Sequence, residues 1–99
     1  MKKSKATVTR TATELANALG LTPADGLEIE IRSDLNDKIV EVVEKKKLTH
    51  VQVAKLAKTS RTRVTAIMNR NTFEISTDLM LRILASLGVH AKIQFRAAA

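Results

Sequence analysis

The chain contains no cysteine, which excludes a disulfide framework, a thiolate metal site and a cysteine nucleophile. Its three glycines, Gly20, Gly26 and Gly88, lie far apart, so the sequence has no glycine-rich phosphate-binding loop. No apolar run approaches the ~20 residues that cross a bilayer, and none follows the basic start, so neither a membrane span nor a secretory signal is expected. With 99 residues we expect one small cytoplasmic domain with tails.

Aromatic residues are scarce as well, because Phe73 and Phe95 are the only two. Proteins that read single-stranded nucleic acids stack bases on several rings, so a duplex is the better expectation here. Seventeen Lys and Arg residues against ten Asp and Glu residues give a formal net charge of +7, which favours a polyanionic partner. Residues 48–73 contain five basic residues and no acidic one, so this window is the candidate for contact with nucleic acid.

The sequence has no set of residues suited to catalysis or to metal binding. His50 and His90 are 40 residues apart and lack the spacing of paired metal ligands. No serine occupies a nucleophile elbow, and the acidic residues are mostly spread along predicted helix faces. We therefore expect a protein that is not an enzyme and that uses neither a metal nor a cofactor.

Hydrophobic spacing predicts a mainly helical chain with a polar start. Residues 1–10 are polar and basic without an apolar period, so we expect a disordered tail. Residues 11–21 predict a short helix and residues 22–26 a turn or linker. Residues 27–32 fit a strand by their alternation and a helix by their four-residue spacing, so both remain open. Together residues 11–32 form the expected N-terminal helix and linker.

From residue 33 onwards the helical signals agree, and residues 33–88 are the expected DNA-binding domain. Ser33 is predicted to cap a helix whose last turn contains the lysines at 45–47. The last helix is predicted from Ser76 or Thr77 to Gly88. The predicted inward side chains of residues 33–88 are Leu35, Ile39, Val42, Val43, Val53, Ala54, Ala57, Val64, Ile67, Met68, Phe73, Ile75, Leu79, Met80, Ile83, Leu84 and Leu87.

Between these helices, residues 49–69 predict two short helices joined by a tight turn. Thr49 and Gln52 fit a capping box at the start of the first helix, and Ser60 is a favourable N-cap for the second. Asn71 tolerates a left-handed conformation and is expected to end the second helix. Two such helices form a helix-turn-helix unit.

Residues 89–96 change to a two-residue period, which predicts a half-buried strand. A lone strand cannot satisfy its backbone groups, so it needs a partner strand. The partner is either the same strand of a second chain or residues 27–32, and we leave this open. Dimerisation is the role expected for this strand, whose inward side chains are Val89, Ala91, Ile93 and Phe95.

The second helix of the unit presents an outer face that suits the major groove of B-form DNA. Arg61 is expected to bond guanine, and Thr62 and Thr65 to contact base edges or a thymine methyl group. Ala66 is small enough to allow close approach. Basic residues around this face are assigned to phosphates, which position a protein without specifying sequence: Lys55, Lys58, Arg63 and Arg70. The helix N-termini at Thr49 and Ser60 add backbone amides for phosphate contact, with His50 beside the first.

The segment from Thr49 to Met68 resembles the helix-turn-helix of the λ-repressor-like, XRE-type regulators. It has their Leu-Thr start, an alanine in mid-helix, a turn, and then Ser-x-x-x-Val-x-x-Ile. The wider order of segments, with Leu-Arg-Ile-Leu-Ala-Ser-Leu-Gly at 81–88 and a terminal strand, is similar to a small antitoxin-like branch related to the antitoxins of HigBA-type pairs. The similarity covers residues 15–96.

This resemblance implies an all-α fold, a λ-repressor-like helix-turn-helix bundle of four or five helices with a C-terminal β-strand. It also implies a homodimer on a roughly palindromic site, and control of its own promoter in the antitoxin branch. It places Arg61, Thr62, Thr65 and Ala66 at the bases, and Thr49, His50, Ser60, Arg63 and Asn69 near the DNA backbone.

Two positions depart from the family pattern. Lys58 stands in the turn where glycine is usual, so the turn requires either a lysine in a left-handed conformation or a different turn. After the recognition helix the usual glycine is absent, and Arg70 and Asn71 stand there instead.

These observations lead to one main hypothesis for function and two alternatives. The main hypothesis is a sequence-specific regulator of transcription, acting as a repressor that binds double-stranded DNA as a dimer. The first alternative is an antitoxin whose main partner is an RNase-type toxin protein, with residues 11–32 as the segment outside the minimal DNA-binding unit. The second is a non-specific basic bundle that binds DNA or a membrane surface.

Overall fold

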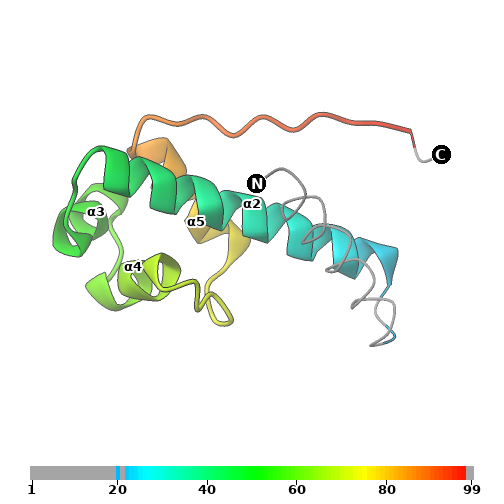
Figure 1. Cartoon of the computed structure of the whole chain (residues 1–99), viewed down its shortest axis with the longest axis horizontal. Coiled ribbons are helices and arrows are strands. Elements are labelled where there is room, and N and C mark those ends of the chain that lie inside the picture. Colours follow the sequence, from blue (N-terminus) through cyan, green and yellow to red (C-terminus); the bar gives the residue numbers. More distant parts are fainter. Residues whose placement is uncertain (1–19, 21, 98–99) are drawn as a thin grey trace. The chain divides into compact units, whose positions relative to one another are not determined.

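Helices make up most of the part of the chain that the computed structural model describes, namely residue 20 and residues 22–97 (Figure 1). They are α2 (Pro23–Lys45), α3 (His50–Ala57), α4 (Arg61–Met68) and α5 (Thr77–Ser86). The chain divides into two compact units, Met1–Leu35 and Asn36–Ala99. The tail expected at residues 1–10 and the helix expected at residues 11–21 lie outside the described residues, apart from Gly20.

The start of α2 corrects the turn or linker that was predicted at residues 22–26. The N–H and the hydroxyl of Thr22 both donate to Asp25 Oδ2 at 2.9 Å, and the N–H of Asp25 donates to Thr22 Oγ1 at 3.2 Å. Pro23 occupies the first helical position, where its missing N–H costs nothing. The bonds from the backbone and side chain of Thr22 hold the pKa of Asp25 below its ordinary value, so a negative charge remains at the positive end of the helix.

Residues 27–32 are helical, which decides between the two structures left open for them. The predicted cap at Ser33 is wrong, because Ser33 lies in the interior of α2. The capping bonds between Thr22 and Asp25 begin the helix eleven residues earlier than Ser33 would have done, and the four-residue spacing then continues without a break.

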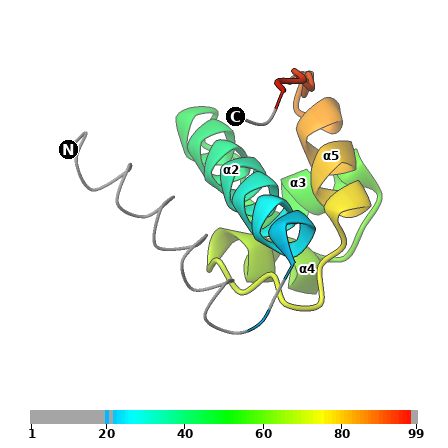
Figure 2. The same cartoon turned by 90° about the vertical axis from the view of Figure 1, so that its right-hand side faces the viewer.

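In the unit Asn36–Ala99, the second half of α2 and the three short helices enclose the hydrophobic core (Figure 2). Ile39, Ile67, Met80 and Ile83 are each at most 1% exposed. α3 packs against both α4 and α5. The predicted inward residues are buried, with the exceptions of Met68, which is half-buried, and Phe73, which is exposed.

A basic residue in the left-handed conformation follows the end of α2, of α3 and of α4. Lys47, Lys58 and Arg70 have φ of 54°, 55° and 60°. In each case the following N–H bonds back into the last turn, as in Thr59 N to Ala54 O at 2.9 Å and Asn71 N to Ala66 O at 2.8 Å. Asn71 was expected to end α4 in a left-handed conformation, but α4 ends at Met68 with Asn69 as its C-cap, and the left-handed residue is Arg70. Of the two possibilities considered for the turn between α3 and α4, the structure therefore has the one in which Lys58 is left-handed.

The predicted C-terminal strand over Val89–Arg96 is not seen in the described chain, in which residues 89–97 have no regular secondary structure (Figure 1). Ile93 is 75% exposed and Phe95 is 92% exposed, and Ala91 is exposed as well. A strand requires a partner for its backbone groups, and the candidate within the chain, residues 27–32, is helical. Pairing of residues 89–96 with residues 27–32 is therefore excluded.

Candidate nucleic-acid interface

Both helices of the predicted DNA-binding unit begin at the side chains that the sequence indicated. Thr49 Oγ1 accepts from the N–H of Gln52 at 3.1 Å, and Gln52 Oε1 accepts from the N–H of Thr49 at 2.8 Å, which completes a capping box. Ser60 Oγ accepts from the N–H of Arg63 at 3.2 Å. Because these side chains satisfy some of the first amides, each helix start is fixed in direction and has its positive dipole end at the surface.

The packing between α3 and α4 leaves one side of α4 facing outwards. Val64 and Ile67 point into the core, together with Val53, Ala54 and Ala57 of α3. The four residues predicted to face bases lie on the other side of α4. Arg61 and Thr62 are exposed, whereas Thr65 and Ala66 are half-buried. Around them the basic side chains predicted to contact phosphates are exposed: Lys55, Lys58, Arg63 and Arg70.

A hydrogen bond between His50 of α3 and Thr65 of α4 joins the two helices, and sequence spacing did not predict it. His50 Nδ1 lies 2.8 Å from Thr65 Oγ1, and both side chains are partly buried. His50 was assigned to the DNA backbone and Thr65 to the bases. Because the imidazole occupies one hydrogen-bonding direction of the Thr65 hydroxyl, it determines which direction stays available for a ligand.

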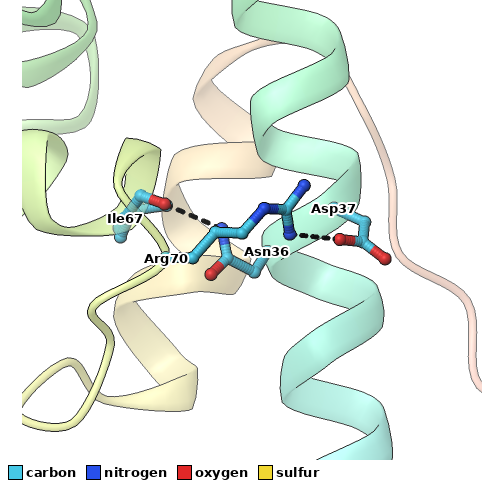
Figure 3. Close-up of polar contacts among 4 residues, drawn as sticks. All are labelled: Asn36, Asp37, Ile67 and Arg70. Atoms are coloured by element: carbon cyan, nitrogen blue, oxygen red, sulfur yellow. Dashed lines mark hydrogen bonds and ion pairs between the residues drawn. The ribbon is translucent and has the colours of Figure 1, made fainter. Parts of the chain in front are cut away.

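The C-terminal end of α4 is held by two polar contacts to the second half of α2 (Figure 3). The buried Asn36 donates from Nδ2 to the carbonyl of Ile67 at 2.9 Å. Arg70 forms an ion pair and hydrogen bond with Asp37, and both side chains are about half exposed. The structure thus places Arg70, which was predicted to contact phosphate, beside a carboxylate of its own chain.

The loop that leads from α4 to α5 borders a hollow beside Thr62 and Ala66 of the outer face of α4. Phe73 is 94% exposed, so its predicted role as a core anchor is wrong, whereas Ile75 is buried as expected. The hollow is lined by the start and outer face of α4 and by this loop, through Ser60, Thr62, Arg63, Ala66, Asn71, Phe73, Glu74 and Ile75. The surface position of Phe73 was not predicted from the hydrophobic pattern, although polar residues flank it on both sides and Ile75 alone suffices as the anchor.

Among the residues that the structure describes, no group of three His, Cys, Asp or Glu side chains could hold a metal ion. No helix in the same part of the chain combines the length and apolar character needed to cross a bilayer. The candidate site is the outer face of α4 with the exposed basic residues of α3, of α4 and of the turns that flank α4.

A family model described as a helix-turn-helix domain matches residues 15–96, which is most of the chain. No curated protein and no solved structure matches. The matched range includes both capped helices, the outer face of α4 and the loop that contains Phe73.

Proposed function

Because the chain belongs to this family of helix-turn-helix domains, we propose that it is a sequence-specific regulator of transcription that places α4 in the major groove of duplex DNA. It works in the cytoplasm, without catalysis, as a repressor that binds a palindromic operator as a homodimer. The observation on which this rests is the outer face of α4, which contains Arg61, Thr62, Thr65 and Ala66, together with the exposed basic side chains of α3, of α4 and of the turns that flank α4.

The distribution of charge supports this function over a generally basic surface. The five basic side chains within residues 48–73 lie on or beside α3 and α4. The same segment contains the N-caps of both helices, Thr49 and Ser60. Phosphate contacts from Lys55, Lys58 and Arg63 position a protein, while hydrogen bonds from Arg61 and the threonines select bases.

Residues 89–97 support the homodimer. Their exposed apolar side chains, Ile93 and Phe95, alternate with polar ones, and pairing with residues 27–32 is excluded because these are helical. In the proposed dimer, residues 89–96 form an antiparallel pair with the same residues of a second chain, which buries Val89, Ala91, Ile93 and Phe95. Two recognition helices related by a two-fold axis then meet two half-sites of a palindrome.

The test is a fluorescence-anisotropy titration of the duplex upstream of the protein's own gene against a scrambled duplex, over a salt series. We expect a preference for the upstream duplex that survives at about 150 mM salt, with two chains bound per duplex. Arg61→Ala should lose about 1–3 kcal/mol of binding free energy, concentrated at one base position, whereas Lys55→Ala should weaken all sequences alike.

Equal binding to both duplexes with a steep salt dependence would contradict the proposal. It would leave only a basic surface and turn attention to the alternative function, an antitoxin that neutralises an RNase-type toxin. A small basic protein encoded next to this chain, and a complex of the two on gel filtration, would then support that alternative.

A further inference from the structure

Phe73 is the most exposed of the large apolar side chains in the described part of the chain, at 94%. It lies in the loop between α4 and α5 (Figure 1). Its ring contributes almost nothing to the core, because Ile75 fills the position under this loop and is only 6% exposed. An aromatic ring left in water gives up the free energy that burial would supply, so a partner that covers the ring would recover it.

The place of the ring points to the kind of partner. Phe73 lines the same hollow as Thr62 and Ala66, two of the residues proposed to face bases. Any ligand that contacts Thr62 and Ala66 therefore also comes within reach of Phe73. The surrounding basic residues, Arg61, Arg63 and Lys58, are exposed and favour a polyanion in that position.

The chemistry of the loop indicates which part of the duplex it meets. Glu74 is exposed beside Phe73 and would be repelled by phosphates, so the loop is unsuited to lie along the DNA backbone. In the major groove, the apolar group that a duplex offers is the C5-methyl of thymine, and phenylalanine and alanine are side chains that contact it.

We propose that Phe73, together with Ala66, reads thymine methyl groups at the edge of each half-site. The proposal rests on the proposed function, because it requires α4 to lie in the major groove. It makes the loop after the recognition helix a second source of sequence preference, one that acts through apolar contact instead of hydrogen bonds.

The experiment removes single methyl groups from the DNA. A preferred duplex is first selected from a random pool with the unmodified protein, and each thymine is then replaced in turn by deoxyuridine, which lacks only the methyl. We expect one or two positions per half-site where the replacement weakens binding about fourfold, the value of one buried methyl group. For Phe73→Ala, at least one of these positions should become insensitive to the replacement.

Leu81→Ala is the matched control, because Leu81 is another exposed apolar residue but lies on α5 and does not line the hollow. This variant should keep the sensitivity to deoxyuridine at every position. Thermal unfolding of Phe73→Ala should match that of the unmodified protein, since the ring is exposed, and this shows that the variant is folded.

Each of the other outcomes overturns the proposal in a recognisable way. If Phe73→Ala retains the full deoxyuridine profile while a preferred duplex exists, the thymine contact is refuted and the proposed function stands. In that case the ring would be available to a protein partner instead. If no duplex is preferred over the random pool, the proposed function fails and this inference fails with it.

Discussion

Asn36, which is 5% exposed, donates a hydrogen bond from Nδ2 to the carbonyl of Ile67 at 2.9 Å. Ile67 lies in the last turn of α4, 31 residues further along the chain. A buried amide group is costly unless it is hydrogen-bonded, so this bond makes one position of α4 against α2 preferable to others. The outer face of α4 is thereby held in a defined orientation by a residue that is not itself among the proposed DNA contacts.

Asn36→Ala is therefore expected to lower the free energy of unfolding by about 1–3 kcal/mol, because it removes the donor and leaves a space in the core. Urea denaturation followed by circular dichroism measures the change. Lys38→Ala is the control on the same helix, since Lys38 is exposed and pairs only with the exposed Glu41, and it should change stability by less than about 1 kcal/mol. Equal effects of the two substitutions would show that the bond to Ile67 is unimportant.

Asp37→Asn tests the ion pair that holds Arg70. The substitution removes the carboxylate that competes with phosphate for the guanidinium, so DNA affinity should rise and the slope of log K against log salt should steepen by about 0.9. Folding stability should change little, because both partners are about half exposed.

Glu44→Gln is the matched control for this prediction. It neutralises one exposed acidic residue on the same helix without touching Arg70. If Asp37→Asn and Glu44→Gln increase affinity and slope equally, only net charge matters and Arg70 does not reach the DNA.

Local signals in the sequence were sufficient where the structure depends on neighbouring residues. The capping box of Thr49 and Gln52 and the cap at Ser60 involve residues three positions apart, so their pattern is visible in the sequence. The same holds for the buried faces of α3 and α5. For Lys58 the family pattern left two alternatives, a left-handed conformation or a different turn, and the structure has the first.

Local signals failed where two of them competed or where a distant partner decides. Ser33 is a good cap in isolation, but Thr22 begins a helix that runs through it. The alternation in residues 89–96 is typical of a strand, but a strand also requires a partner. The contacts of His50 with Thr65 and of Asp37 with Arg70 join residues 15 and 33 positions apart, so no spacing rule could indicate them.

Lys58→Gly is expected to separate the structural from the proposed binding role of this turn. Glycine adopts the left-handed conformation of φ 55° without the strain of a side chain, so the free energy of unfolding should rise by about 0.5–1 kcal/mol. DNA affinity should nevertheless fall and the salt slope should decrease by about 0.9, because one phosphate contact is lost.

Lys58→Ala provides the comparison, because it removes the same charge but keeps a Cβ in the left-handed conformation. It should weaken DNA binding as much as Lys58→Gly, without the gain in stability. A Lys58→Gly protein that binds DNA as tightly as the unmodified chain would show that Lys58 serves the turn alone.

The bond between His50 and Thr65 leads to a prediction about base preference. Because His50 Nδ1 lies 2.8 Å from Thr65 Oγ1, loss of the imidazole should free the hydroxyl to turn, and the preference at the base pair facing Thr65 should relax. His50→Ala and Thr65→Val should therefore alter preference at the same base pair, and the double variant should lose less binding free energy than the sum of the two, by about 0.5–1.5 kcal/mol. Binding to a set of duplexes that vary at one base pair at a time measures both effects.

Gln52→Ala, on the same helix start but without a contact to Thr65, should leave the base preference unchanged. If His50→Ala instead weakens every duplex equally, the imidazole acts only on the DNA backbone and does not orient the hydroxyl.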